Sequence, residues 1–240
     1  MSALVVGAGG TIGLACVEAL KGKFESVVAA DIVIPKISGV SCMEVDVTNL
    51  ASVQSLVSTI EQAGPIEGFV YAAGVNFTGP IDATDWEQYD KLMRVNLQGA
   101  FYFGAAIESA MRKTRRSFAA VFISSTAGLK GEAGGSVYVA TKFGLRGFVE
   151  SFASELAPLG GRANTVCPGN VDSPMLSQLA KKVAERQGKE HSQVLAEFAA
   201  SSAFNRLISP AEVAEVCAWL VSDSSSGVSG QTVVVDGPTP

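Results

Sequence analysis

Residues 3–13 read ALVVGAGGTIG, and this stretch decides the fold of the chain. Its first four residues are apolar and predict a short buried strand. A helical pattern begins after the glycines and continues to Leu20. Glycine allows the sharp backbone turn that joins a strand directly to a helix. The stretch therefore predicts a strand, a tight glycine loop and a helix.

The same loop is suited to a phosphate group. Glycines let the backbone come close to a pyrophosphate, whose charge is met by amide groups and by the positive end of the following helix. Gly7, Gly10 and Gly13, together with Thr11 and Ile12, are candidate contacts of such a group. A tight turn that binds nothing is the alternative interpretation.

Asp31 follows the next predicted strand, residues 27–30. An acid here can accept hydrogen bonds from the ribose hydroxyls of adenosine, and it repels a 2′-phosphate. No Lys or Arg lies in the glycine loop or at positions 32–34 to neutralise such a phosphate. The sequence therefore predicts NAD rather than NADP as the cofactor. The alternative is that Asp31 only begins a turn that Pro35 continues.

Strand and helix patterns alternate through the rest of the chain. Such alternation indicates one α/β domain over residues 1–240, with a parallel sheet covered by helices on both faces. The further predicted strands are 41–45, 66–72, 119–123, 164–167 and 231–235, and the further helices are 50–62, 84–98, 99–115, 138–156 and 210–221. The last of these helices begins with a capping box, Ser209 and Glu212.

Residues 174–206 are the least hydrophobic part of the chain, with two predicted helices broken near Gly188. This pattern predicts a movable cover over the substrate, and a plain amphipathic surface helix is the alternative. The charged residues of the segment are expected to face water: Lys181, Lys182, Glu185, Arg186 and Lys189.

The composition excludes several classes of protein. A net charge of -5 gives no basic surface for nucleic acid, and the cluster at 112–116 is assigned to a helix C-terminus. No apolar run reaches the ~18 residues of a membrane span, and no charged segment precedes the first strand, so we expect a soluble, cytoplasmic protein. Four separated cysteines and a single histidine, His191, argue against a metal site and a His-based triad.

A second stretch carries the chemistry. Ser125 ends an apolar run, and Tyr138 precedes Lys142 by four residues, which places phenol and ammonium about one helical turn apart. A phenol titrates near ~10 and is a poor base at neutral pH unless a cation favours the phenolate. Lys142 is the candidate for that cation, although a Tyr and a Lys at this spacing also occur by chance.

Three other positions remain open from the residues alone. Asn96 interrupts an apolar helix face as either a buried structural amide or a functional one. Asp46 is either a cofactor contact or part of a cap, with Thr48 or Asn49 capping the next helix. Residues 72–74 are small and would let a flat ring come close to the backbone.

Together these motifs resemble the short-chain dehydrogenase/reductase family, in its compact single-domain branch. The resemblance covers essentially the whole chain, and the joint match of Asn96, Ser125, Tyr138 and Lys142 is its most specific part. It implies a single-domain Rossmann fold with a seven-stranded parallel sheet in the order 3-2-1-4-5-6-7. The segments at 168–169 and 235–237 also match the family pattern.

Two departures accompany this match. Thr11 occupies the place of the family's second glycine, so the glycine spacing is more similar to that of the longer, sugar-nucleotide-modifying branch. Those epimerases and dehydratases add a substrate domain for which this chain is too short. The usual Asn-Asn-Ala-Gly signature is replaced by residues 71–74, YAAG, which removes an amide that buttresses the central strand.

The resemblance implies roles for individual residues. Tyr138 would exchange the substrate proton, Lys142 would lower the pKa of Tyr138 and bind the nicotinamide ribose, Ser125 would hold the substrate oxygen, and Asn96 would fix a water that relays protons. Val171 and Ser173 would contact the nicotinamide carboxamide. The predicted cofactor contacts are Gly7, Gly10, Thr11, Ile12, Gly13, Asp31, Asp46, Val47, Ala73, Gly74, Tyr138, Lys142, Pro168, Gly169, Val171 and Ser173.

The expected function is an NAD-dependent oxidoreductase that interconverts a small or medium secondary alcohol, diol or hydroxy compound and its ketone. Two alternatives remain: an NADP-dependent ketoreductase of the 3-oxoacyl type, and a non-enzymatic NAD(H)-sensing protein. The expected partners are a small-molecule substrate and further copies of the chain, as a tetramer or dimer through residues 99–115 and 138–156. Candidate substrate contacts are Asn76, Gly128, Lys130, Glu132, Asn170, Met175 and Phe198.

Overall fold

The structure is a computed structural model that describes residues 2–237, so residues 1 and 238–240 of the predicted domain lie outside it. Seven strands form one parallel sheet in the order β3-β2-β1-β4-β5-β6-β7, which confirms the predicted topology. The strands are β1 (Ser2–Val6), β2 (Ser26–Asp31), β3 (Ser41–Glu44), β4 (Ile66–Tyr71), β5 (Phe118–Ile123), β6 (Gly161–Pro168) and β7 (Thr232–Val235).

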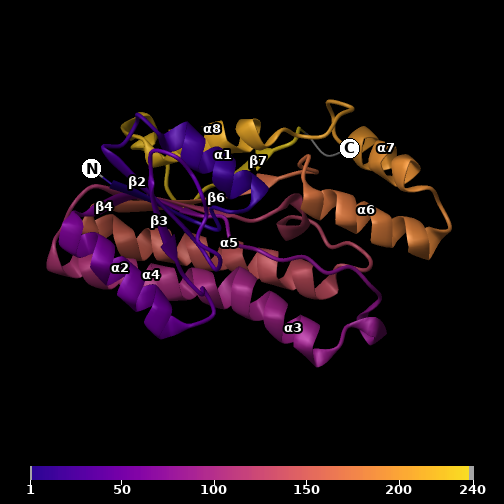
Figure 1. Cartoon of the computed structure of the whole chain (residues 1–240), viewed down its shortest axis with the longest axis horizontal. Helices are drawn as coiled ribbons and strands as arrows, with labels where there is room; N and C mark the ends of the chain where they lie inside the picture. The colour runs from indigo at the N-terminus through magenta and orange to yellow at the C-terminus, as the bar shows by residue number, and fades with distance from the viewer. Residues whose placement is uncertain (1, 238–240) are drawn as a thin grey trace.

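Helices cover both faces of the sheet (Figure 1). On one face, α2 (Leu50–Ala63), α4 (Gly99–Lys113) and α5 (Ser136–Leu156) share a large apolar cluster with the sheet. On the other face, α1 (Thr11–Leu20) and α8 (Pro210–Val221) contribute to a second cluster. The sheet is buried on both sides, which explains why its central strands are almost entirely apolar.

The predicted helix pair at 84–98 and 99–115 is one continuous path with an irregular centre. Helix α3 (Trp86–Met93) runs into a π-helical turn (Arg94–Gln98), which runs into α4. The Tyr71 hydroxyl donates to the carbonyl of Val95 within this turn, over 2.6 Å. A π-turn inside a helix is rare and is frequent at functional sites.

Helices α6 (Pro174–Gln187) and α7 (His191–Ala200) form the predicted helix pair of segment 174–206, with Gly188 at the C-cap of α6. They project beyond one end of the sheet in Figure 1. Their facing sides form a small apolar cluster of their own, centred on Ala180, Ala184 and Val194. This pair therefore packs separately from the two large clusters.

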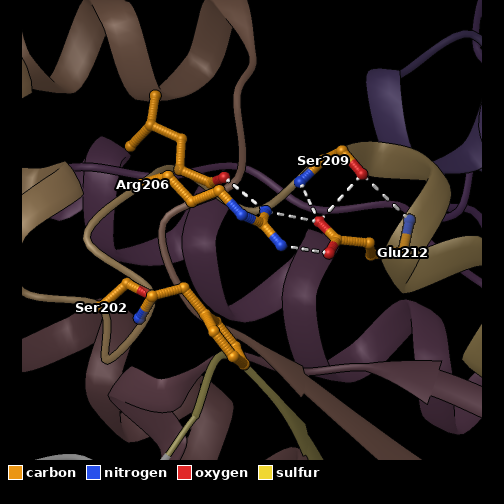
Figure 2. A network of polar contacts seen from close by, with 6 residues as sticks. Ser202, Arg206, Ser209 and Glu212 are labelled. Atoms are coloured by element: carbon orange, nitrogen blue, oxygen red, sulfur yellow. Dashed lines mark hydrogen bonds and ion pairs between the residues drawn. The ribbon is translucent and has the colours of Figure 1, made fainter.

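The chain returns from α7 to the sheet through a fixed junction. Ile208 pairs with Val171 in a parallel bridge, and Asp172 N–H donates to the Ile208 carbonyl. Figure 2 shows the next residues, where the predicted capping box forms: Ser209 caps α8, and the Glu212 carboxylate accepts from Ser209 N–H and binds the Arg206 guanidinium. The junction fixes the loop after β6.

Other expectations concern the surface and the cysteines. Arg112 and Lys113 lie in the last turn of α4, as predicted. The four cysteines are free, and three of them are buried. Within residues 2–237, no helix is both long and apolar enough to cross a membrane.

Candidate active site

Two cavities lie along the carboxyl ends of the strands, where parallel α/β sheets bind their ligands. The first has a volume of about 780 Å³ and follows the ends of β1, β2 and β4. The second has a volume of about 480 Å³ and follows the ends of β5 and β6. The strand order brings loops that are far apart in sequence to one edge of the sheet.

Most of the predicted site residues line one or the other of these two cavities. The first is lined by Gly7, Gly10, Asp31, Asp46, Val47, Ala73 and Gly74. The second is lined by Ile12, Ser125, Tyr138, Pro168, Gly169, Val171 and Ser173, and by the substrate candidates Asn76, Glu132, Asn170, Met175 and Phe198. The remaining predicted residues, Thr11, Gly13, Asn96, Gly128, Lys130 and Lys142, are not among the lining residues of either cavity.

The glycine loop has no room for side chains at its two decisive positions. Gly7 has a φ of +81°, and a Cβ there would overlap the backbone of Ala73. A Cβ at Gly13 would overlap the Gly7 carbonyl. The glycines thus let α1 begin directly against the ends of β1 and β4, and the first cavity opens beside this contact. This cradle fits a dinucleotide pyrophosphate.

Asp31 lies at the end of β2 on the wall of the first cavity. Its Oδ2 accepts from Gly9 N–H over 2.9 Å, and its Oδ1 accepts from Ile32 N–H over 2.7 Å. These two bonds hold the carboxylate in place at the cavity. Ile32, Val33 and Ile34 follow it as exposed aliphatic residues lining the same cavity.

Asp46 forms a local turn before α2 without being its cap, and its role as a cofactor contact stays a prediction. Its Oδ1 accepts from the Thr48 N–H and from the Thr48 hydroxyl, which forms a local turn before α2. Asn49 is the cap of α2 and accepts from Ala51 N–H and Ser52 N–H. Asp46 also lines the first cavity.

Asn96 is fully buried in the π-helical turn. Its Oδ1 accepts from Val75 N–H over 2.8 Å, and its Nδ2 donates to the Val75 carbonyl and to the Thr141 hydroxyl. Both amide donors are therefore engaged in joining the loop after β4 to α5. This arrangement supports the structural interpretation of the Asn96 side chain, and the expected water relay stays a prediction.

Ser125 and Tyr138 face the second cavity together, and Lys142 lies behind them. Ser125 follows β5 and accepts from Ala127 N–H, which fixes its hydroxyl at the start of a short 3₁₀ turn (Thr126–Gly128). Lys142 is buried, its Nζ donates to the Ile123 carbonyl over 2.9 Å, and it lies 5.7 Å from the centroid of the Tyr138 ring. The predicted catalytic group is thus assembled from β5 and α5.

Burial has the largest effect on the electrostatics of this group. Burial raises the pKa of Tyr138 to about 12, a hydrogen bond with Ser125 opposes this rise, and the charge of Glu132 adds to it. Burial also lowers the pKa of Lys142 to about 8. The hydrogen bond with Ser125 lowers the pKa of Tyr138, and the expected contribution of Lys142 stays a prediction. At physiological pH the phenol is therefore neutral and carries the proton that reduction requires, whereas taking a proton in oxidation is favoured by higher pH.

Several polar lining residues were not among the predicted contacts, and four of them are Thr78, Lys36, Arg186 and Gln187. Lys36 lies just beyond positions 32–34, where no cation was found. Arg186 is exposed, as predicted, and it also lies on the wall of the second cavity, where both terminal nitrogens approach the Thr78 hydroxyl at 3.4 and 3.5 Å. No motif marks Arg186 and Gln187, because their part of the cavity wall exists only when α6 lies beside the loops that follow the strands.

A family model described as enoyl-(acyl carrier protein) reductase matches residues 7–238. The chain belongs to the short-chain dehydrogenase/reductase family. A diacetyl reductase [(S)-acetoin forming] from Staphylococcus aureus is 33% identical over 193 residues, which cover 80% of this chain and 75% of the relative. A galactitol 2-dehydrogenase from Agrobacterium fabrum is 28% identical, in a match that covers 98% of this chain and 95% of the relative.

A solved short-chain dehydrogenase/reductase has the same fold. A variant of the actinorhodin polyketide ketoreductase, solved with NADPH, superimposes with a TM-score of 0.90 at 26% identity, over 98% of this chain and 95% of the other. The chain is therefore an oxidoreductase of a family that binds a nicotinamide cofactor.

The structure also accounts for one departure from the short-chain dehydrogenase/reductase pattern. Tyr71 stands in place of the first Asn of the usual signature, and its hydroxyl reaches the Val95 carbonyl. The space beside it is kept open by Gly99, where a Cβ would overlap the Tyr71 hydroxyl. Ala72 N–H donates to the Val6 carbonyl, so backbone pairing continues to the end of the central strands. A phenol thus buttresses this region in place of the missing amide.

Proposed function

We propose that this chain is an NAD-dependent dehydrogenase/reductase that interconverts a small or medium secondary alcohol and its ketone. The observation that carries the proposal is the placement of Ser125 and Tyr138 on one cavity wall, with Lys142 5.7 Å from the phenol ring. The diacetyl reductase and the galactitol 2-dehydrogenase, by their names, act on compounds of this kind. Both relatives support the reaction class rather than one substrate.

In the proposed reaction, the cofactor transfers hydride and the side chains of the second cavity handle the proton. The bound nicotinamide supplies or accepts hydride at the carbinol carbon. Ser125 holds the substrate oxygen, and Tyr138 gives its proton to that oxygen in reduction or removes it in oxidation. The Lys142 ammonium stabilises the phenolate that remains after the proton is given. Contact with the carboxamide is assigned to Val171 and Ser173, and their position on the wall of the second cavity supports this assignment.

Glu132 provides a test of the proton role of Tyr138. Replacing Glu132 by Gln is expected to lower the pKa of Tyr138, because it removes a negative charge that raises that pKa. Oxidation needs the phenolate, so the pH at which kcat/KM for oxidation rises should be lower in E132Q than in wild type. The pH above which kcat/KM for reduction falls should be lower as well. Profiles of kcat/KM against pH measure this shift. Glu185→Gln, on the exposed side of α6, is the charge-matched control.

An unchanged E132Q profile, or a shift to higher pH, would contradict the assignment of Tyr138 as the titrating group. The same result in E185Q as in E132Q would assign the shift to overall charge instead.

The preference for NAD rests on Asp31, which is fixed at the first cavity by Gly9 N–H and Ile32 N–H. A 2′-phosphate beside this carboxylate would face a like charge, which costs several kcal/mol. The competing candidate is an NADP-dependent ketoreductase, favoured by Lys36 on the same cavity wall and by the NADPH in the related ketoreductase structure.

Comparison of the two cofactors separates these candidates. Wild-type kcat/KM is expected to favour NAD over NADP by at least about tenfold, and Asp31→Ser should move the ratio toward NADP by a similar factor. Lys36→Gln is the matched variant, and it should leave the use of NAD unchanged. A wild-type preference for NADP that K36Q abolishes would instead establish the ketoreductase alternative.

The substrate class is tested by an NAD-dependent screen of secondary alcohols, diols and hydroxy acids, read from NADH absorbance. Turnover of at least one group is expected. Tight NADH binding without turnover across the panel would favour the alternative, a cofactor-sensing protein.

The surroundings of the site are part of the proposal. Segment 174–206 is proposed as the substrate cover, because Met175, Leu176 and Phe198 line the second cavity. A homodimer or homotetramer is proposed through α4 and α5, where Phe101 and Phe143 are exposed. A cytoplasmic location is proposed because the four free cysteines suit a reducing compartment.

A further inference from the structure

The second cavity carries two charged side chains beyond the reacting group. Glu132 comes from the loop before α5, and Arg186 comes from the last turn of α6. Within residues 2–237, neither side chain has an ion-pair partner. A charged side chain that lines a cavity without a partner is available to a ligand.

Arg186 has most of its hydrogen-bonding capacity unused. A guanidinium has five N–H donors in a planar fork. Here two of its nitrogens approach one acceptor, the Thr78 hydroxyl, at 3.4 and 3.5 Å, which is long for a hydrogen bond. Gly134 lies beside the guanidinium and has no side chain to cover it. The fork therefore remains open toward the cavity, with Thr78 beside it as a second polar group.

The charge of Glu132 affects which substrate groups can bind near it in the second cavity. Glu132 lines the same cavity as Tyr138, and its charge raises the pKa of Tyr138. An anionic group would be repelled there, whereas hydroxyl groups of a substrate could donate to it. A negative group would instead bind Arg186, whose guanidinium fork matches carboxylate and phosphate oxygens.

We propose that Arg186, together with Thr78, anchors a carboxylate or phosphate group of the substrate in the second cavity. This inference rests on the proposed function, since it assumes that the carbinol carbon lies at Ser125 and Tyr138. It narrows the substrate class to secondary alcohols and ketones that carry an acid group away from the reacting carbon. It also gives a role to Arg186 within the proposed substrate cover, because α6 brings this side chain to the second cavity.

The test uses matched substrates with the chain of residues 1–240 and NAD. Each secondary hydroxy acid is paired with its neutral amide, and each hydroxyalkyl phosphate is paired with the corresponding diol. The measured quantity is the ratio of kcat/KM for the anionic member to that for the neutral member. The variants are Arg186→Gln and, as control, Lys181→Gln, a basic residue on the same helix that is exposed and lines neither cavity.

We expect wild type to favour an anionic member by about 10- to 100-fold, the effect of a charge-assisted pair, and R186Q to lose this preference. The K181Q control should keep it. Whichever pair gives the larger ratio identifies the group as carboxylate or phosphate. Equal use of both members, an unchanged ratio in R186Q, or a preference for amino alcohols, which would make Glu132 the anchor, would overturn the proposal.

A second measurement keeps the two proposals separate. The same compounds are titrated into the complex with NADH, and binding is followed by cofactor fluorescence. If no compound is turned over, the proposed function fails. The titration still decides the anchor, because weaker binding of the anionic compounds to R186Q than to K181Q supports it and equal binding overturns it.

Discussion

Replacing Tyr138 by Phe is expected to lower kcat by about 10²–10⁴-fold, the usual contribution of a placed general acid or base. Phe keeps the ring and the packing beside Lys142, and it removes only the hydroxyl that exchanges the proton. NADH affinity should change little, because the first cavity, which would hold the adenosine and pyrophosphate, does not include this side chain. Both kcat and the NADH dissociation constant are measured.

The control for this variant is Tyr102→Phe. Tyr102 lies on α4, outside both cavities, and loses the same hydroxyl. It should retain wild-type turnover. Residual activity of Y138F within about tenfold of wild type would remove Tyr138 from the catalytic role, since a placed proton donor is worth more than that.

Replacing Gly7 by Ala should have the second large effect, on both stability and cofactor binding. The backbone at Gly7 has a φ of +81°, which costs an L-residue roughly 1–2 kcal/mol. The new Cβ would also overlap the backbone at Ala72 and Ala73, and forcing extra atoms into packed structure costs about 1–3 kcal/mol more. We therefore expect a loss of about 2–5 kcal/mol in the free energy of unfolding and a lower Tm.

Gly22→Ala separates the two causes. Gly22 has nearly the same φ, +76°, but a Cβ there meets nothing within 4 Å. This variant should lose only the conformational part, about 1–2 kcal/mol, and should keep NADH binding. Thermal unfolding with and without NADH measures both effects, because a bound ligand raises the Tm. Equal losses in G7A and G22A would show that crowding at the loop does not matter.

The sequence was sufficient for the parts of the fold that local pattern controls. Apolar strands alternate with amphipathic helices, and the strand order, which followed from the family resemblance, is confirmed. The Ser209 and Glu212 capping box is equally local and forms as predicted. Asp31 lies on the wall of the first cavity, because it is the last residue of β2, whose end borders that cavity.

What the sequence could not provide depends on contacts between distant segments. The π-helical turn at 94–98 is accompanied by bonds from Tyr71 to Val95 and from Asn96 to Val75, and nothing in RVNLQ indicates them. The pKa of Tyr138 depends on burial by the whole site. Periodicity correctly put Arg186 on the polar face of its helix, but it could not reveal that this face borders a cavity.

The small apolar cluster between α6 and α7 allows this helix pair to change in sequence separately from the sheet. Ala180, Ala184 and Val194 pack with each other rather than with the two clusters that hold the sheet. Regions with few contacts to the main core unfold and refold with their own, lower free energy. Mutations that reshape this helix pair should therefore leave the stability of the sheet nearly unaffected. With this pair as the proposed substrate cover, new substrate preferences could arise with little loss of stability in the sheet.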